Sequence, residues 1–225
     1  MKMKILTVAL CIAVLICATM LCTVAYLTDT SEAVNTFTVG KVHIELDEAA
    51  VNTDGEPIAN GAVVNSINDA DRTEKGNEYH LIPGKTYVKD PTVNVIAGSE
   101  EAYIRMIITV NKLSELDAIF APNGAELLSI FNGYDSNVWI LSSEFEADNT
   151  KTYEFRYYTS VDAADVKDDI TLEPLFTSFT VPDNLDSDAL KSIDGLVITA
   201  IGNAIQKSGF NNEDEAWKAF DLQNK

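Results

Sequence analysis

YIRMIITV, residues 103–110, is the most apolar stretch of the chain beyond residue 25. Its apolar residues recur at every second position, which is typical of a β-strand with one face in a hydrophobic core. We therefore expect a central strand with Tyr103 and Arg105 on one face. The residues expected on the core face are Ile104, Met106, Ile108 and Val110.

The same alternation recurs along the chain in shorter stretches bounded by turn residues. Val42, Ile44 and Leu46, for example, take every second position near the start. Such a pattern indicates many short β-strands. Besides 103–110, the segments expected to be strands are 37–46, 87–96, 138–141, 152–159, 172–181 and 196–204. The polar stretch 146–151 makes 138–141 and 152–159 a hairpin candidate. Phe176 and Phe179 lie out of phase, so a bend is expected within 172–181.

Two segments have the spacing of a short amphipathic helix instead. Residues 114–120 are expected to form one, with Ser114 as its N-cap. Residues 213–220 carry acidic residues in the first turn and are expected to form the other. That terminal helix would dock through aromatic residues three positions apart, Trp217 and Phe220.

Residues 52–77 are rich in Asn, Asp, Gly and Glu, and we interpret them as a loop insertion, since strand patterns continue on both sides. The elements together predict a mainly β fold, a jelly-roll-like β-sandwich with a few short inserted helices. We expect it to form a single domain over residues 26–225, preceded by an N-terminal signal helix.

The first 25 residues have the order of a secretory signal peptide. Lys2 and Lys4 precede an apolar run, and the motif TVA, which ends at Ala25, has the small-x-small form that a signal peptidase cuts after. We expect cleavage between Ala25 and Tyr26, which makes the protein secreted, with an extracellular-matrix or cell-surface location. The alternative is an uncleaved anchor, because residues 5–25 are long enough to cross a membrane.

Removal of the signal peptide leaves a strongly acidic chain without cysteine. The full sequence has 35 acidic and 16 basic residues and a net charge of −19, and loss of two N-terminal lysines brings the charge to −21. Its cysteines, Cys11, Cys17 and Cys22, all lie in the removed segment, so the mature chain forms no disulfide and no thiolate metal site. The charge argues against nucleic acid and anionic membranes as partners, and the membrane is met only through the precursor signal segment.

Few residues have the types and spacing that catalysis needs. His43 and His80 are interpreted as structural residues, and the sequence contains no His-Glu-x-x-His helix and no Gly-x-Ser-x-Gly motif. We therefore predict that the protein is not an enzyme and has no catalytic, cofactor or metal site. The acidic loops 68–71 and 183–188 leave weak extracellular calcium binding as an alternative, although neither has the spacing of a calcium loop.

The region after the cleavage site contains several motifs in a recognisable order. YLTDT at 26–30, NTFTVG at 35–40 and VHIEL at 42–46 follow one another, and LIPGKTYVKD at 81–90 and AGSEEAYIR at 97–105 come later. The order resembles the TasA/camelysin family of secreted proteins of Gram-positive bacteria. The C-terminal end is similar to that family as well, whereas the middle of the chain matches nothing in it.

The resemblance implies export through a signal peptidase of the SipW type, a jelly-roll fold and assembly into fibres of a biofilm matrix. In such fibres the N-terminal segment of one subunit completes a sheet of the next by donor-strand addition. Proline at Thr30 is expected to remove a hydrogen-bond donor from this strand. The candidate donor strand covers 26–37, with interface residues Tyr26, Leu27, Thr28, Asp29, Thr30, Ser31, Val34 and Phe37.

Three functions are therefore considered. We expect a secreted structural subunit that forms a homopolymer fibre, with other matrix or cell-wall proteins as further candidate partners. The first alternative is a monomeric, surface-displayed binding or adhesion module, for which 26–37 would be an internal edge strand or a frayed terminus. The second is a camelysin-like metalloprotease, for which the sequence supplies no recognisable ligands.

Overall fold

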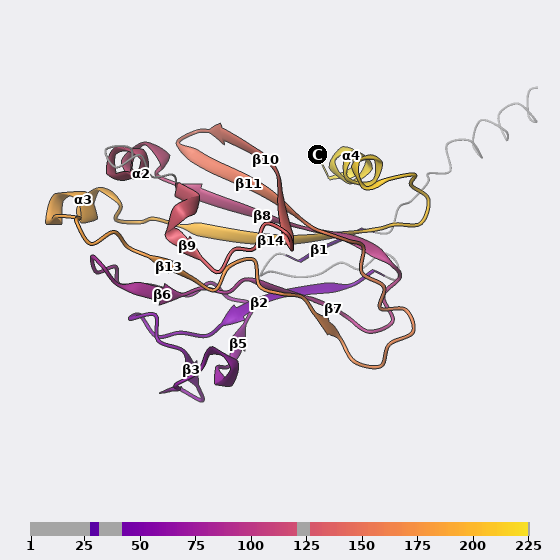
Figure 1. Cartoon of the computed structure of the whole chain (residues 1–225), viewed down its shortest axis with the longest axis horizontal. Helices are drawn as coiled ribbons and strands as arrows, with labels where there is room; N and C mark the ends of the chain where they lie inside the picture. The colour runs from indigo at the N-terminus through magenta and orange to yellow at the C-terminus, as the bar shows by residue number, and fades with distance from the viewer. Residues whose placement is uncertain (1–27, 32–41, 121–126, 225) are drawn as a thin grey trace, which may run out of the picture.

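Two packed layers of β-strands form the body of the molecule, with short helices at its ends (Figure 1). The structure, a computed structural model, describes residues 28–31, 42–120 and 127–224. One layer is a five-stranded sheet of order β1-β14-β8-β11-β10, and the other layer contains sheets of order β12-β7-β2-β5 and β6-β13-β9. The arrangement confirms the predicted mainly β, jelly-roll-like sandwich with a few short helices. The predicted signal helix and cleavage site lie outside the described residues.

The five-stranded sheet is built around the central strand that the sequence predicts. The core residues of this strand, Ile104, Met106, Ile108 and Val110, are at most 1% exposed, because the alternation places them between the two layers. The strands of this sheet are β1 (Thr28–Ser31), β14 (Ile198–Gln206), β8 (Ala102–Asn111), β11 (Thr150–Tyr157) and β10 (Trp139–Ala147).

The second layer corrects one expected strand and confirms the bend expected in another. Residues 87–96 form two strands instead of one, because Pro91 has no N–H and the Asp90 carboxylate accepts a 2.7 Å hydrogen bond from the N–H of Ala49. Residues 172–181 bend between two short strands, and their Leu and Phe side chains fill the core. The strands are β2 (Ile44–Ala49), β6 (Thr86–Val88), β7 (Thr92–Val95), β9 (Phe131–Asn132), β12 (Ile170–Thr171) and β13 (Ser178–Thr180).

Strands β10 and β11 form the predicted hairpin, longer than expected at the β10 end. Asp148 and Asn149 form its turn, both at positive φ (51° and 61°), which is typical of a tight hairpin turn. The Asn149 side chain accepts hydrogen bonds from the N–H and hydroxyl of Ser114 at the start of α2 (Leu113–Phe120). The expected N-cap role of Ser114 is therefore wrong. The N–H of Ser114 lies in the first turn of α2, and its acceptor is the side chain of Asn149 in the hairpin turn. A 3₁₀ turn, η3 (Leu127–Ile130), precedes β9.

Helix α4 (Glu213–Gln223) covers part of the outer face of the five-stranded sheet, and its Trp217 and Phe220 are buried as predicted. The Arg105 guanidinium lies 4.5 Å from the Trp217 ring centroid and 4.8 Å from that of Phe220. It also forms a 2.7 Å ion pair with Asp221. Arg105 is on the outer face, as expected, and only 6% exposed because α4 covers it. Helix α3 (Ser187–Ser192) lies at the opposite end of the molecule (Figure 1).

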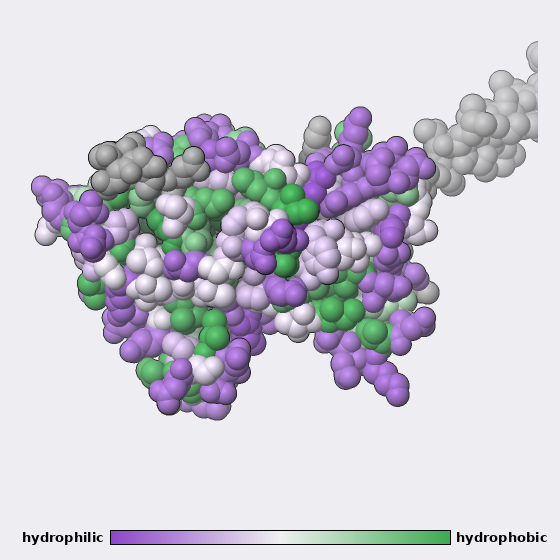
Figure 2. Space-filling model, viewed as in Figure 1, coloured by the Kyte–Doolittle hydropathy of each residue, from purple (hydrophilic) through white to green (hydrophobic). Residues whose placement is uncertain are grey.

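The predicted insertion at 52–77 contains short ordered elements that project from the lower layer (Figure 1). Strand β5 pairs with β2, so the insertion also adds an edge strand to the four-stranded sheet. Figure 2 shows hydrophilic residues over most of the outline of one face of the molecule, with hydrophobic residues in small groups between them. The elements of the insertion are β3 (Ile58–Ala59), β4 (Ala62–Val63), η1 (Ile67–Asp69) and β5 (Arg72–Thr73).

Candidate functional site

Part of the candidate donor segment lies at the edge of the five-stranded sheet. Strand β1 pairs antiparallel with β14, from Thr28 opposite Ile205 to Ser31 opposite Gly202. The pairing places Thr28, Asp29, Thr30 and Ser31 in an edge strand of their own sheet, as the internal-edge-strand alternative expects, and pairing with another copy stays a prediction. The other predicted interface residues, Tyr26, Leu27, Val34 and Phe37, lie outside the described residues.

Two backbone hydrogen bonds at the ends of the β14–β8 pairing show which N–H and C=O groups of β14 point to β8 and which point to β1. Asn111 N donates to Val197 O (3.3 Å), and Lys207 N donates to Glu101 O (2.8 Å). Because bonded pairs alternate in an antiparallel ladder, the odd-numbered residues of β14 bond to β8. The N–H and C=O groups that point to the β1 side therefore belong to the even-numbered residues, Ile198, Ala200, Gly202 and Ala204.

Strand β1 covers about half of this edge. It lies opposite Gly202–Ile205, and within the described residues Ile198 and Ala200 have no strand partner on that side. A Cβ atom placed on Gly202 would lie 3.4 Å from Ile44 Cδ1, so β14 and β2 approach each other closely beneath β1. Glycine at this position permits that approach, as expected for a strand glycine.

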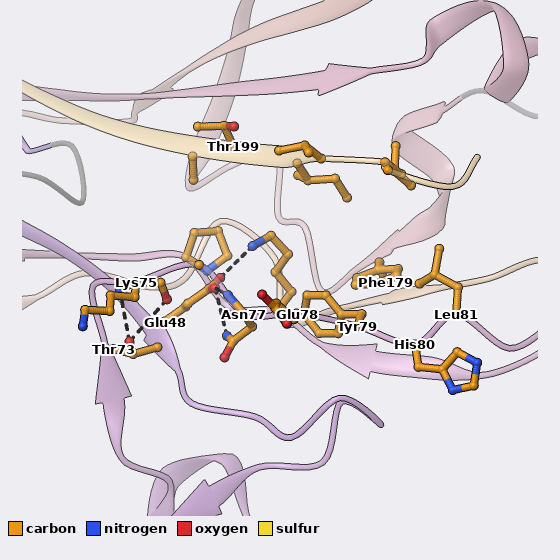
Figure 3. Close-up of a pocket in the computed structure, with 18 of the residues that line it drawn as sticks. Glu48, Thr73, Lys75, Asn77, Glu78, Tyr79, His80, Leu81, Phe179 and Thr199 are labelled. Carbon is orange, nitrogen blue, oxygen red and sulfur yellow. Dashed lines mark hydrogen bonds and ion pairs between the residues drawn. The ribbon is translucent and has the colours of Figure 1, made fainter. Parts of the chain in front are cut away.

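The uncovered half of the edge opens into a cavity of about 890 Å³ between the two layers. Figure 3 shows β14 on one side, where Thr199 lies, and the segment with Asn77, Tyr79 and Leu81 on the other. The walls are mainly apolar, which is typical of a site that binds apolar groups. The apolar side chains that line it include Tyr79, Leu81, Phe179, Leu190, Ile193, Leu196 and Ile198.

An ion pair forms the polar part of the cavity wall. Lys89 Nζ lies 2.7 Å from Glu48 Oε2, and the two side chains are 7% and 9% exposed. The same carboxylate accepts hydrogen bonds from the backbone N–H (3.1 Å) and the side-chain amide (2.9 Å) of Asn77. Burial, with a smaller effect of Glu48, raises the pKa of Tyr79 far above its usual value, and the Tyr79 hydroxyl donates to Val88 O. Tyr79 therefore stays neutral and fixed in the wall.

A second polar cluster attaches the insertion next to this wall. Arg72 of β5 bonds to Asp47 (2.7 Å) and to Asp90. Burial raises the pKa of Asp90, while its bonds to Ala49 N and Arg72 oppose that shift. The cluster ties β5 to β2 and to the break between β6 and β7, so it fixes the start of the loop that lines the cavity.

The other residues that the sequence singled out do not converge. His80 lies at the rim of the cavity and is exposed, whereas His43 is half-buried on the far part of the lower layer. Asp186 caps α3 by accepting from the N–H groups of Asp188 and Ala189. Across 28–31, 42–120 and 127–224, no group of three or more His, Cys, Asp and Glu side chains is placed to hold a metal ion.

Sequence reasoning missed the cavity and its ion pair, although a signal for the pair is present. Glu48 takes the next inward position after Val42, Ile44 and Leu46, and Lys89 takes the inward position after Tyr87. A charge at an inward strand position must be paired when it is buried. Two opposite charges at such inward positions, one on β2 and one directly after β6, predict each other as partners.

The comparisons with known proteins found no relative. No family model matches the chain, and no curated protein or solved structure matches it. Among the helices in the described part of the chain, none is long and apolar enough to cross a membrane.

Proposed function

We propose that the protein is a secreted structural subunit of an extracellular fibre, in which the N-terminal strand of one copy pairs with β14 of the next. The observation that carries the proposal is the position of β1, a four-residue strand near the N-terminus that forms the outer edge of the five-stranded sheet. A short edge strand that belongs to a terminal segment can be exchanged between copies without rebuilding the core.

The pairing of β1 with β14 supports exchange of β1 between copies. Its hydrogen bonds join backbone N–H and C=O groups, so β1 of another copy makes the same bonds. Exchange therefore costs little enthalpy, and concentration decides between the closed monomer and the chain of copies. Within the described residues, Ile198 and Ala200 have no strand partner on the β1 side, and an incoming chain can begin to pair there.

The cavity favours the second candidate, a monomeric binding or adhesion module on the cell surface. A volume of about 890 Å³ with mainly apolar walls is within the range of pockets that hold small molecules or side chains. In that case β1 would stay in its own sheet. The metalloprotease alternative is suggested by the family resemblance alone.

The test uses protein secreted from the full-length gene and purified from the medium. N-terminal sequencing should begin at Tyr26, and electron microscopy with light scattering should show fibres that lengthen with time and concentration. A membrane-bound full-length chain would contradict secretion, and a species of constant size would favour the binding module.

Two proline variants test the strand itself. Ser31 lies opposite Gly202 in a bonded pair, so Ser31→Pro removes an N–H that points to β14. The N–H of Thr30 points away from β14 by the same alternation, so Thr30→Pro is the matched control. This reverses the sequence-based expectation for Thr30. We expect Ser31→Pro, and also a chain that starts at Thr38, to stay folded by circular dichroism and to form no fibres. Normal fibres from Ser31→Pro would overturn the proposed function.

A further inference from the structure

We infer that Lys89 and Asn77 form an amide cross-link within the chain, with Glu48 as the group that carries the protons. The link joins Lys89 Nζ to Asn77 Cγ and releases ammonia. It does not depend on the proposed fibre function, because all three residues belong to one copy and lie within the described part of the chain.

One carboxylate contacts both reacting groups. Glu48 Oε2 accepts a 2.7 Å hydrogen bond from Lys89 Nζ, and Oε1 accepts a 2.9 Å hydrogen bond from Asn77 Nδ2. Figure 3 shows Glu48 beside Asn77 in the cavity wall, with dashed lines at its carboxylate. Groups that folding has already brought together lose little further freedom when they react.

The amide of Asn77 is oriented for attack at its carbonyl carbon. Val51 N–H donates a 3.1 Å hydrogen bond to Asn77 Oδ1, the atom on which negative charge develops during the attack. Nδ2, the leaving nitrogen, donates to Ala49 O (2.9 Å) as well as to Glu48. The carbonyl oxygen therefore has a fixed backbone donor, and the leaving nitrogen lies next to a carboxyl group that can protonate it.

Little water reaches the reacting groups. The side chains of Lys89 and Glu48 are 7% and 9% exposed, and the cavity wall around them is mainly apolar. Separated charges are costly in such surroundings, whereas a neutral amine and a neutral acid are not. One proton that moves along the hydrogen bond converts the ion pair into amine and acid. The amine is then a nucleophile, and the acid is a proton donor.

The reaction needs no oxidant, reductant or cofactor. The Nζ lone pair forms the new bond to Asn77 Cγ, while the carbonyl electron pair moves to Oδ1. The Glu48 acid gives its proton to Nδ2, the Cγ–Nδ2 bond breaks as the carbonyl forms again, and ammonia leaves. The carboxylate then takes the surplus proton from Nζ, so Glu48 ends the step as the neutral acid that began it. The ion pair in the structure is the state of the site before the link forms.

A cross-link of this kind suits a chain without disulfides. Beyond residue 25 the sequence contains no cysteine. Asn77 lies in the loop that lines the cavity, and Lys89 directly follows β6. The link therefore closes residues 77–89 into a covalent loop, and such closure constrains the unfolded chain as a disulfide does.

Mass spectrometry tests the link directly, on protein produced from the full-length gene. After refolding and incubation at neutral pH, the intact mass should fall by the mass of one ammonia. Trypsin does not cut after an acylated lysine, so residues 76–85 and 86–105 should appear as one branched peptide joined through Asn77 and Lys89. An unchanged mass would overturn the proposal. Loss of ammonia from peptide 76–85 alone would also overturn it, because that product arises by cyclisation of Asn77.

A pair of glutamate variants tests the proton carrier. Glu48→Gln keeps the size of the side chain but cannot exchange protons, so the branched peptide should form roughly 100-fold more slowly. Glu115→Gln is the matched control, since Glu115 also accepts a hydrogen bond from an asparagine amide, that of Asn149 (3.0 Å), but at an exposed position. This control should form the link at the original rate. A Glu48→Gln chain that is folded by circular dichroism and forms the link equally fast would refute the role of Glu48.

A third variant tests the assignment of the amine. Lys89→Met should keep the mass expected from its sequence under the same incubation. Loss of ammonia from this variant would place the reaction at another residue and refute the assignment. The branched peptide of the original chain decides the proposal even where a variant does not fold.

Discussion

Glu48 and Lys89 form a 2.7 Å ion pair that is almost fully buried in the wall of the cavity. The pair joins β2 to the segment between β6 and β7, two parts of one layer that lie far apart in sequence. Its carboxylate also accepts both N–H groups of Asn77, so the loop along the cavity depends on it.

Removal of one partner of this pair should destabilise the protein strongly. Lys89→Met leaves the Glu48 carboxylate buried without its cation, and we expect a loss of about 3–5 kcal/mol in the free energy of unfolding, measured with urea. The double variant Glu48→Gln, Lys89→Met should recover most of that loss because no unpaired charge remains. An equal or larger loss in the double variant would show that packing, not the unpaired charge, sets the cost.

The central strand should be sensitive to loss of side-chain volume. Ile108 is 1% exposed on the core face of β8, and Ile108→Ala should cost about 2–5 kcal/mol. The melting temperature measures the effect, and Ile140→Ala, at a 48% exposed position on β10, serves as control. A melting temperature unchanged in both variants would contradict the assigned core face.

Arg105 should hold α4 on the sheet. Arg105→Lys keeps the positive charge but loses the planar group that contacts the Trp217 and Phe220 rings and reaches Asp221. We expect the Trp217 fluorescence to shift to longer wavelength as the ring becomes more exposed to water. Arg156→Lys, which affects a more exposed ion pair with Asp214, should leave the emission unchanged.

One hydrogen bond should make stability depend on pH. The Tyr157 hydroxyl donates a 2.6 Å hydrogen bond to Glu173 and is the main cause of the lowered pKa of that carboxyl. A carboxyl whose pKa is lowered by folding stabilises the protein above its usual value of 4.5, and the effect is lost as pH falls through the lower folded value.

Tyr157→Phe should therefore be less stable than the original protein at pH 7, and the difference should shrink below about pH 4. Tyr158→Phe, at a 57% exposed neighbouring position, is the control. A difference that is constant from pH 7 to pH 3 would show that the hydrogen bond has no effect on the ionisation of Glu173.

Fibre growth should accelerate with salt. In the proposed mature form, which lacks the two N-terminal lysines, the net charge of −19 becomes −21, so copies repel one another. The screening length falls from about 10 Å at 0.1 M salt to about 3 Å at 1 M, which weakens that repulsion. Light scattering at increasing sodium chloride should show faster growth, and growth that slows with salt would contradict repulsion as the main barrier.

The sequence by itself determined the fold class, the central strand, the β10–β11 hairpin and the docking of α4. Each of these depends on local periodicity or on turn residues, as with Ile104 and Met106 alternating in β8 or the polar stretch 146–151 at the hairpin turn. A period of two fixes which side chains share a face whatever the partner strand is, so these features can be read before any tertiary contact is known.

Only the tertiary structure decided the rest. The Asp90–Ala49 hydrogen bond at the split between β6 and β7, the capping of α2 by Asn149 and the Glu48–Lys89 pair all join residues that are distant in sequence. The pairing of β1 with β14 also joins residues that are distant in sequence. Its register decides that the N–H of Ser31 points to β14 and that of Thr30 points away. Register and layer spacing arise from packing between segments, and local propensity carries no information about which distant segment a strand will meet.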